Sequence, residues 1–404
     1  NDPYKLFFTC GDKRSNYLCI SDDKGENIIQ KPLPCSVHGN EVGRATGDRL
    51  IYKNGRLYFG SQTAGIIYSE DIGESWQSID LYGEKNISLI WTDSEGKLFI
   101  AGCSGEANSP DGVTRGHTLY CSTDGLKSFV PLTAPDPVKY ENSSYYGFVP
   151  QRITSDSRYI YITFASSGKV FYGGMGAYAC DTGSLSGGKV YRYRIENGVP
   201  VFDTDITPED DTPCGYSGIC SNGKMLLLST VCRKNGGDMI YTSTDSGESW
   251  KIIMNGLEYS RFDWNIPYMK PAYNGGGNCV HWISDIKLSP FDSDTALFNT
   301  GTGLFMITGL ASGDVLIKPF CEGIEETVHL NVYTTSHGRN RIIDIIGDLG
   351  GFAFKDYDSE CENSFANEKG DRYITCLNAD LTLSDPEYIV ATPRGNWTGK
   401  TKGG

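Results

Sequence analysis

The 404-residue sequence contains no long apolar run and no cluster of basic residues. A membrane-spanning helix needs about 20 consecutive apolar residues, so none is predicted. The formal net charge is −14, whereas nucleic acids and anionic membrane surfaces are bound through patches of Lys and Arg. We therefore expect no nucleic-acid partner and no membrane partner, and a neutral or cationic ligand instead.

Signals for metal binding are also missing. The 13 cysteines include no C-x-x-C pair, which argues against a zinc site. Thirteen cysteines are many for a cytosolic β protein but ordinary for a secreted protein that uses disulfides. The pairs closest along the chain are Cys214/Cys220 and Cys361/Cys376. An odd number leaves at least one cysteine without a partner in this chain.

The first residues do not form a signal peptide, so we expect any such peptide to have been removed already. Three N-glycosylation sequons begin at Asn86, Asn142 and Asn396. Together with the cysteines, they favour a secreted glycoprotein.

A short motif occurs twice almost letter for letter, as SEDIGESW at residues 69–76 and STDSGESW at residues 243–250. Weaker copies begin at Ser21 and Ser122, and the first three copies lie about 50 residues apart, the length of one four-stranded blade. In S-x-D-x-G-x-x-W, Ser and Asp can bind local backbone, Gly can take a positive φ and Trp can pack under a hairpin. This Asp-box pattern is typical of β-propeller blades, and we expect Asp71 and Asp245 to be turn residues rather than catalysts.

Composition favours the same fold class. The chain has 49 Gly, 25 Tyr and 17 Phe, as many short strands with tight turns require. Alternating segments at residues 57–60, 97–102 and 159–164 predict strands, and no segment has a capped helical period. We predict an all-β protein with few helices.

Three blocks in the last third of the chain carry a family resemblance. They are HWISDIKLSPFDSD at 281–294 with TGTGLF at 300–305, EGIEETV at 322–328, and IGDLGGF at 346–352. Upstream, GRATGDRL at 43–50 with LYFGS at 57–61, and FVPQR at 148–152, extend the match. In this order the blocks resemble glycoside hydrolase family 74, the xyloglucan-cleaving endo-β-1,4-glucanases and their oligoxyloglucan-specific relatives.

The resemblance implies two seven-bladed propellers with a glucan cleft between them, and hydrolysis by inversion with two carboxyl groups. In such a reaction one carboxylic acid protonates the leaving oxygen and an opposite carboxylate activates water. The two carboxyl groups lie roughly 6.5 to 9.5 Å apart, which leaves room for that water. Asp348 matches the family position of the general acid, and Leu349 and Phe352 could provide an apolar wall that raises its pKa. No cofactor is implied.

The family base belongs to a T-D-I-G-G element upstream of residues 43–49, and this chain has none there. We therefore assign no base and expect the chain to be the middle of a longer protein. Residues 1–335 are predicted to form most of a first propeller, incomplete at its N-terminus. Residues 336–404 are predicted to begin a second one.

Glucose rings stack on aromatic side chains while their hydroxyls form hydrogen bonds. The candidates for binding plant cell-wall xyloglucan or a related β-glucan are Tyr145, Tyr146, Arg152, Trp264 and Tyr268. Residues 232–238 lack the adjacent tryptophans that the family often has there.

Two alternatives come from other classes. A sialidase would need an F-R-I-P element, but Arg152-Ile153 is followed by Thr154. A non-catalytic propeller, acting as a glycan-binding or receptor module, would need no acid/base pair.

Overall fold

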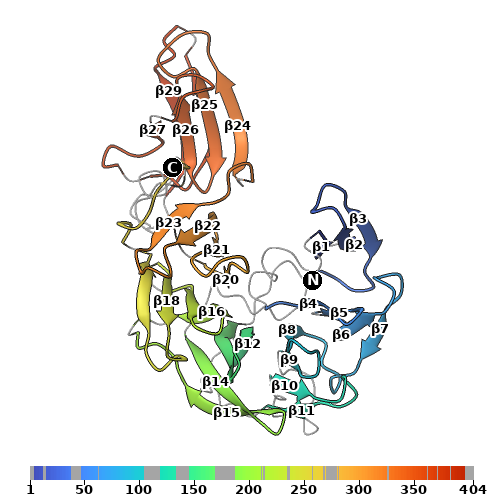
Figure 1. Cartoon of the computed structure of the whole chain (residues 1–404). Coiled ribbons are helices and arrows are strands. Elements are labelled where there is room, and N and C mark those ends of the chain that lie inside the picture. Colours follow the sequence, from blue (N-terminus) through green and yellow to red (C-terminus); the bar gives the residue numbers. More distant parts are fainter. Residues whose placement is uncertain are drawn as a thin grey trace. The chain divides into compact units, whose positions relative to one another are not determined.

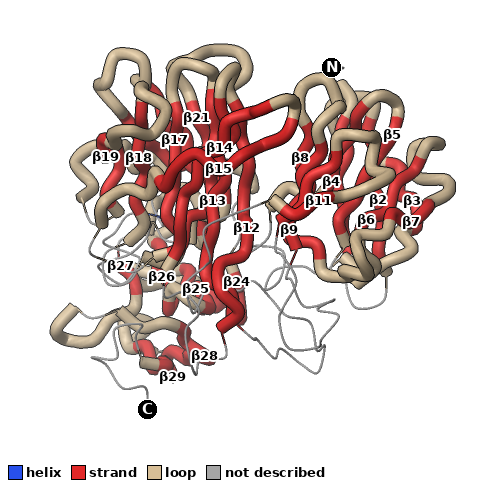
Figure 2. Tube along the Cα trace, turned by 90° about the horizontal axis from the view of Figure 1, so that it is seen from below, coloured by secondary structure: helices blue, strands red, loops and turns tan. Residues whose placement is uncertain are grey.

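The structure, a computed structural model, describes residues 4–11, 15–37, 47–61, 63–103, 119–132, 145–168, 187–210, 212, 214–233, 237–256, 258–266, 269, 280, 282–324, 327–361, 363–370, 372–382 and 384–395. Over these residues it contains strands and turns and no α-helix (Figure 2). The chain divides into two compact units. Unit 1 comprises Asn1–Ile253 and Trp282–Leu288, and unit 2 comprises Met254–His281 and Ser289–Gly404.

Unit 1 consists of antiparallel sheets in which consecutive strands are neighbours. The first sheet has three strands, β1 (Leu6–Gly11), β2 (Asn16–Ser21) and β3 (Ile29–Pro32). The second has four, β4 (Leu50–Lys53), β5 (Arg56–Gly60), β6 (Ile66–Ser69) and β7 (Gln77–Ile79). The third has β8 (Ile87–Thr92), β9 (Phe99–Cys103), β10 (Leu119–Ser122) and β11 (Val130–Pro131).

Two further four-stranded sheets complete the sequence of sheets in unit 1, and Figure 1 shows the sheets following one another along an arc. The fourth has β12 (Tyr145–Ser155), β13 (Tyr159–Gly168), β14 (Gly188–Glu196) and β15 (Val199–Asp205). The fifth has β16 (Gly215–Ser221), β17 (Leu226–Val231), β18 (Met239–Ser243) and β19 (Lys251–Asn255). Strand β20 (Asp285–Leu288) packs on β16, where Gly218 lies so close to Ile286 that a Cβ would meet its backbone nitrogen at 2.5 Å.

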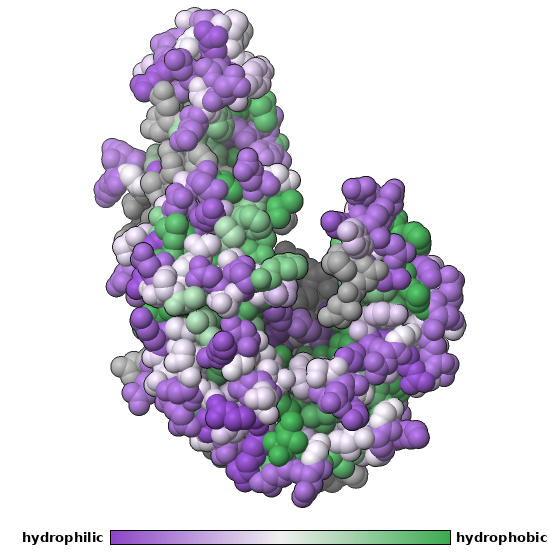
Figure 3. Space-filling view, viewed as in Figure 1, coloured by the Kyte–Doolittle hydropathy of each residue, from purple (hydrophilic) through white to green (hydrophobic). Residues whose placement is uncertain are grey.

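The core of unit 1 lies between successive sheets. One cluster joins Leu89 and Ile100 of the third sheet to Ile160 and Phe164 of the fourth, all almost fully buried. Polar side chains dominate the outer surface in the view of Figure 3, with small apolar patches between them. Burial between sheets rather than within one sheet is how the blades of a propeller are stabilised.

Unit 2 contains an antiparallel meander of β21 (Ala296–Thr300), β22 (Gly303–Thr308) and β23 (Leu316–Pro319). Its other sheet has the order β24-β25-β26-β28-β29, with β27 paired to β26. These strands are β24 (Val328–Thr334), β25 (Ile342–Gly347), β26 (Gly350–Phe354), β27 (Asn363–Ser364), β28 (Thr375–Leu381) and β29 (Ile389–Arg394). This sheet begins at Val328, a little before the predicted domain boundary at 335, and that boundary stays a prediction.

The four copies of the repeated motif form the same turn between neighbouring strands: β2–β3, β6–β7, β10–β11 and β18–β19. In the copy at Asp71, the Asp71 carboxylate accepts hydrogen bonds from the Ser69 hydroxyl and from the Ser75 amide and hydroxyl. Ile72 and Gly73 both have positive φ, of 55° and 84°. The sequence identifies the glycine as the left-handed position, but the residue before it adopts the same conformation, as a type I′ turn requires.

The all-β prediction is confirmed, and the predicted strands at 57–60, 97–102 and 159–164 coincide with β5, β9 and β13 within a few residues. The four-stranded sheets are consistent with propeller blades. The number of blades and the presence of a second propeller stay predictions.

Candidate functional site

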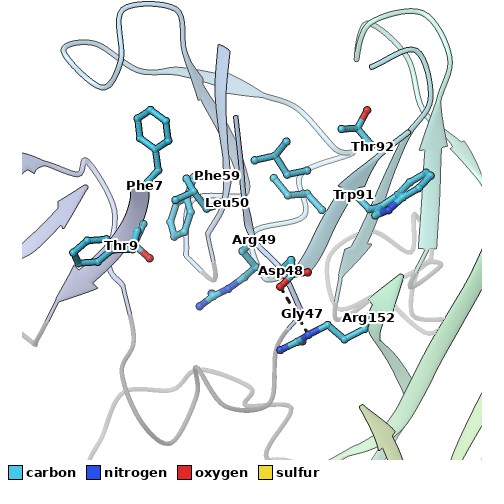
Figure 4. Close-up of a pocket in the computed structure, with 13 residues that line it drawn as sticks. Phe7, Thr9, Gly47, Asp48, Arg49, Leu50, Phe59, Trp91, Thr92 and Arg152 are labelled. Atoms are coloured by element: carbon cyan, nitrogen blue, oxygen red, sulfur yellow. Dashed lines mark ion pairs between the residues drawn. The ribbon is translucent and has the colours of Figure 1, made fainter. Parts of the chain in front are cut away.

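An open pocket of about 570 Å³ lies in unit 1 between β1, β4 and β8. Its lining combines aromatic side chains with charged groups: Phe7, Phe8, Thr9, Gly47, Asp48, Arg49, Leu50, Ile51, Phe59, Ile90, Trp91, Thr92 and Arg152. Figure 4 shows Asp48 facing Arg152 at one side of the pocket, with Phe7 and Thr9 on the strand across from them. The pocket thus brings Gly47, Asp48, Arg49 and Leu50, from one segment of the family resemblance, near Arg152 from another.

Four charged side chains form an alternating network at the Arg152 side of this pocket. The Nε atom of Arg152 lies 3.4 Å from the Asp285 carboxylate and 3.9 Å from that of Asp48. The Nζ atom of Lys287 lies 3.0 Å from Asp48 and 3.2 Å from Asp285. Arg152 is buried, whereas the side chain of Asp48 is 57% exposed, so Asp48 is the member of the network most open to a ligand.

The network favours the charged forms of Asp48 and Lys287. Partial desolvation by the surrounding protein opposes ionisation of Asp48, but the guanidinium of Arg152 and the ammonium of Lys287 outweigh it and hold the pKa of Asp48 below its ordinary value. Partial desolvation also opposes the charged form of Lys287, but the carboxylates of Asp285 and Asp48 outweigh it, and the pKa of Lys287 is raised. At neutral pH the pocket therefore presents a carboxylate that can accept hydrogen bonds, fixed by two cations.

Asp348, the proposed acid, lies in unit 2 in the tight turn between β25 and β26. The residue is exposed and has a φ of 63°, and its amide donates to the Thr375 hydroxyl at 3.1 Å. Phe352 is buried in an apolar cluster against which Leu349 packs. A hydrogen bond to the first residue of β28 thus holds the backbone of this turn, while Asp348 itself is exposed.

Three polar side chains on β24 and β25, or directly before β24, are linked by hydrogen bonds. The Nδ1 atom of His329 lies 2.8 Å from the buried carboxylate of Asp344, and its Nε2 atom lies 2.5 Å from the Thr327 hydroxyl. The register pairs Val328 of β24 with Gly347, the last residue of β25 before the turn that holds Asp348. His329 and Asp344 therefore lie on the paired strands β24 and β25, of which β25 leads into the turn of Asp348.

The other predicted binding residues have different surroundings. Arg152 is in the pocket, as described. Trp264 is half-buried in unit 2, where its ring stacks on Phe262 at 4.9 Å and meets Phe305 edge-on. One face of Trp264 is therefore already covered. Tyr268 lies outside the described residues, and the structure describes only the backbone of Tyr145 and Tyr146, in β12.

Asp71 and Asp245 behave as turn residues. The carboxylate of Asp245 accepts from the hydroxyls of Ser243 and Ser249 and from the Ser249 amide. Hydrogen bonds from the Ser249 hydroxyl and amide and from the Ser243 hydroxyl lower its pKa to about 2. A carboxyl with a lowered pKa and occupied oxygens is poorly suited to act as a general acid.

The structure shows no disulfide between Cys214 and Cys220 or between Cys361 and Cys376. Within the part of the chain that the structure describes, no three His, Cys, Asp or Glu residues are arranged to hold a metal ion. That part also contains no helix of the length and apolarity that a bilayer crossing needs.

Relatives of known activity match nearly the whole chain. The chain is 24% identical over 421 residues to an oligoxyloglucan-reducing end-specific xyloglucanase of Emericella nidulans, covering 89% of this chain and 50% of that protein. It is 22% identical to a xyloglucanase of a Paenibacillus species, and the match covers 98% of this chain and 40% of that protein. The chain is similar to the xyloglucanases of glycoside hydrolase family 74. The resemblance drawn from the sequence is thereby confirmed, and the chain spans about half the length of these relatives or less.

Solved structures agree on the fold. The crystal structure of a GH74 xyloglucanase from Xanthomonas campestris superposes with a TM-score of 0.72 at 20% identity, over 97% of this chain and 55% of that one. A GH74 enzyme from Niastella koreensis also gives 0.72, at 19% identity. No family model matches the sequence.

Asp48, Asp285 and Lys287 are not among the site residues that the sequence predicts. All three lie inside segments that carry the family resemblance, and Asp285 and Lys287 stand two apart on β20, which places them on one face of a strand. An Asp and a Lys two positions apart in a predicted strand are the feature of the sequence that indicates such a charged pair. The contacts of β20 with Asp48 and Arg152, each more than a hundred residues away in the chain, cannot be predicted from the sequence.

Proposed function

We propose that this chain is part of a secreted glycoside hydrolase that cleaves the β-1,4-glucan backbone of xyloglucan by an inverting acid/base mechanism. The observation that carries the proposal is the similarity to xyloglucanases over 86–98% of the chain. The family 74 fold, with a TM-score of 0.72, supports it.

The pocket of unit 1 suits a carbohydrate. Sugar hydroxyls form strong hydrogen bonds with charged groups, and apolar sugar faces pack on aromatic rings. Asp48 supplies an ionised, fixed acceptor, while Phe8 and Trp91 supply aromatic surface that is partly exposed. We propose that this pocket binds a glucosyl or xylosyl unit and that Arg152 positions Asp48.

In the reaction, Asp348 would protonate the glycosidic oxygen as the bond to the anomeric carbon breaks. Water, activated by a second carboxylate opposite, would attack that carbon from the other face and invert its configuration. The chain offers Asp348 on a turn with a fixed backbone, which limits the range of positions of the carboxyl group. The second carboxylate is not assigned.

The test is product formation from tamarind xyloglucan by the full protein, run beside an unbranched β-1,4-glucan. Xyloglucan oligosaccharides should be released, and NMR of the first products should show the α anomer at the new reducing end. Products that start as the β anomer would contradict inversion. Binding without release would contradict hydrolysis and leave the non-catalytic glycan-binding module as the function.

A further inference from the structure

The thiols of Cys10 and Cys19 are in contact across two antiparallel strands. Cys10 lies on β1 and Cys19 on β2, and their Sγ atoms are 3.2 Å apart. The register pairs Cys10 with Tyr17 and Phe8 with Cys19, so both cysteines point to the same face of the sheet. The two cysteines are diagonal neighbours across the strand pair. A disulfide needs an S–S distance of about 2.05 Å, so the two sulfur atoms must approach further from their 3.2 Å contact for the bond to form.

We propose that Cys10 and Cys19 form a disulfide in the protein under oxidising conditions. The two pairs closest along the sequence, Cys214/Cys220 and Cys361/Cys376, are not bridged in the structure. Cys35, a third cysteine packed near β2, lies in the apolar cluster that contains Leu18 and Ile20. The 3.2 Å contact between the sulfur atoms of Cys10 and Cys19 is therefore the observation that carries the proposal.

The chemistry is thiol–disulfide exchange with a small disulfide such as oxidised glutathione. The Cys10 thiolate attacks one sulfur of the reagent and releases one glutathione thiolate, leaving a mixed disulfide on Cys10. The Cys19 thiolate then attacks the Cys10 sulfur and releases the second glutathione. The protein loses two electrons and two protons, and the reagent is reduced to two thiols.

The order of attack follows from exposure and burial. Cys10 is half-buried, whereas Cys19 is 1% exposed. Burial, together with its contact with Cys10, raises the pKa of Cys19 to about 11, so its thiolate is scarce at neutral pH. Cys10 therefore reacts first with the reagent, and closure of the protein disulfide should become faster as the pH rises.

The link would fix one wall of the pocket. β1 is an end strand of its sheet, so among the described residues it pairs with β2 alone. Its residues Phe7, Phe8 and Thr9 line the pocket. A covalent tie from Cys10 to Cys19 would hold this strand against β2 and reduce its local opening.

The experiment is disulfide mapping of the full protein after equilibration in an oxidised/reduced glutathione buffer. Free thiols are blocked with N-ethylmaleimide in denaturant, and the digest is analysed without reduction. We expect a linked peptide pair that contains Cys10 and Cys19, formed faster at pH 9 than at pH 7. The variant Cys35→Ser should retain the link, and Cys10→Ser should leave Cys19 fully alkylated.

Hydrogen exchange gives a second measurement that does not depend on a variant that folds. In the wild-type protein, amides of residues 6–11 should exchange more slowly in the oxidised form than in the reduced form. Complete alkylation of both cysteines after oxidation, or a bond from Cys10 to another cysteine, would overturn the proposal. Neither result depends on whether the protein hydrolyses xyloglucan.

Discussion

Arg192 of β14 donates a hydrogen bond from its Nη1 atom to the backbone carbonyl oxygen of Ser246, at 2.9 Å. Ser246 lies in the turn between β18 and β19, so a strand of the fourth sheet holds the turn of the fifth. The same guanidinium pairs with Asp203 at 2.7 Å and with Glu248 at 2.8 Å, and it lies over the ring of Tyr159. The repeated turn is thus a point of attachment between sheets as well as a connection within one.

Replacing this arginine should destabilise unit 1. Arg192 is only 7% exposed, and the substitution Arg192→Met removes several hydrogen bonds and leaves the Asp203 carboxylate less well compensated. We expect a loss of about 2–3 kcal/mol in the free energy of unfolding, measured by urea denaturation. Arg194→Met is the matched control, because Arg194 is about half exposed and should cost less than about 1 kcal/mol. Equal losses in the two variants would contradict this role.

Asp238 should be among the most sensitive polar positions. It is fully buried and accepts hydrogen bonds from the Thr230 hydroxyl at 2.8 Å and from the amides of Arg233 and Ile283 at 3.0 and 3.1 Å. Asp238→Ala leaves these donors without their acceptor, and we expect a loss of about 3 kcal/mol or more. Thermal unfolding of the variant beside Asp358→Ala, an exposed aspartate, provides the measurement. A loss in Asp238→Ala no larger than in the control would show that water can replace the carboxylate.

The aspartates of the repeated turns should make the free energy of unfolding decrease at low pH. Hydrogen bonds from neighbouring serine and asparagine residues hold the pKa of Asp23, Asp124 and Asp245 at about 2 and lower that of Asp71 further. A carboxyl group whose pKa is lower in the folded than in the unfolded protein stabilises the fold fully at a pH above its unfolded-state pKa of about 3.9. This stabilisation is lost as the pH falls toward 2. Urea midpoints of the wild type and Asp245→Asn should therefore differ more at pH 6 than at pH 3. A constant difference would contradict this linkage.

The turns can be predicted from the sequence because their hydrogen bonds join residues that are close along the chain. In the motif at 69–76, the Ser69 hydroxyl donates to the Asp71 carboxylate and accepts from the Gly73 amide. The charged network could not be predicted in the same way, because Asp48, Arg152 and Asp285 come from three distant segments that only the stacking of sheets brings together. The contact of Cys10 with Cys19 likewise depends on the register of β1 against β2, which cysteine spacing does not specify.

Asp48 should contribute to substrate binding if the pocket holds a sugar. Asp48→Asn keeps the size of the side chain but removes the charge that Arg152 and Lys287 fix in place. We expect the Kd for a xyloglucan oligosaccharide to rise about tenfold, which corresponds to about 1.4 kcal/mol, by isothermal titration calorimetry. Asp93→Asn, a change of the same charge outside the pocket lining, is the control. An unchanged Kd for Asp48→Asn would exclude the pocket as a binding site for this ligand.

Hydrolysis of xyloglucan with Asp348 as the general acid is tested by comparing reducing-sugar release from xyloglucan by the wild type, Asp348→Asn and Asp358→Asn, each in the full protein. Loss of a general acid typically lowers the rate by a factor of about 10² to 10⁴, so we predict that fall for Asp348→Asn and none for Asp358→Asn. Release that survives in Asp348→Asn, with both variants folded, would contradict the assignment of Asp348. The absence of release by the wild type would contradict the hydrolase itself.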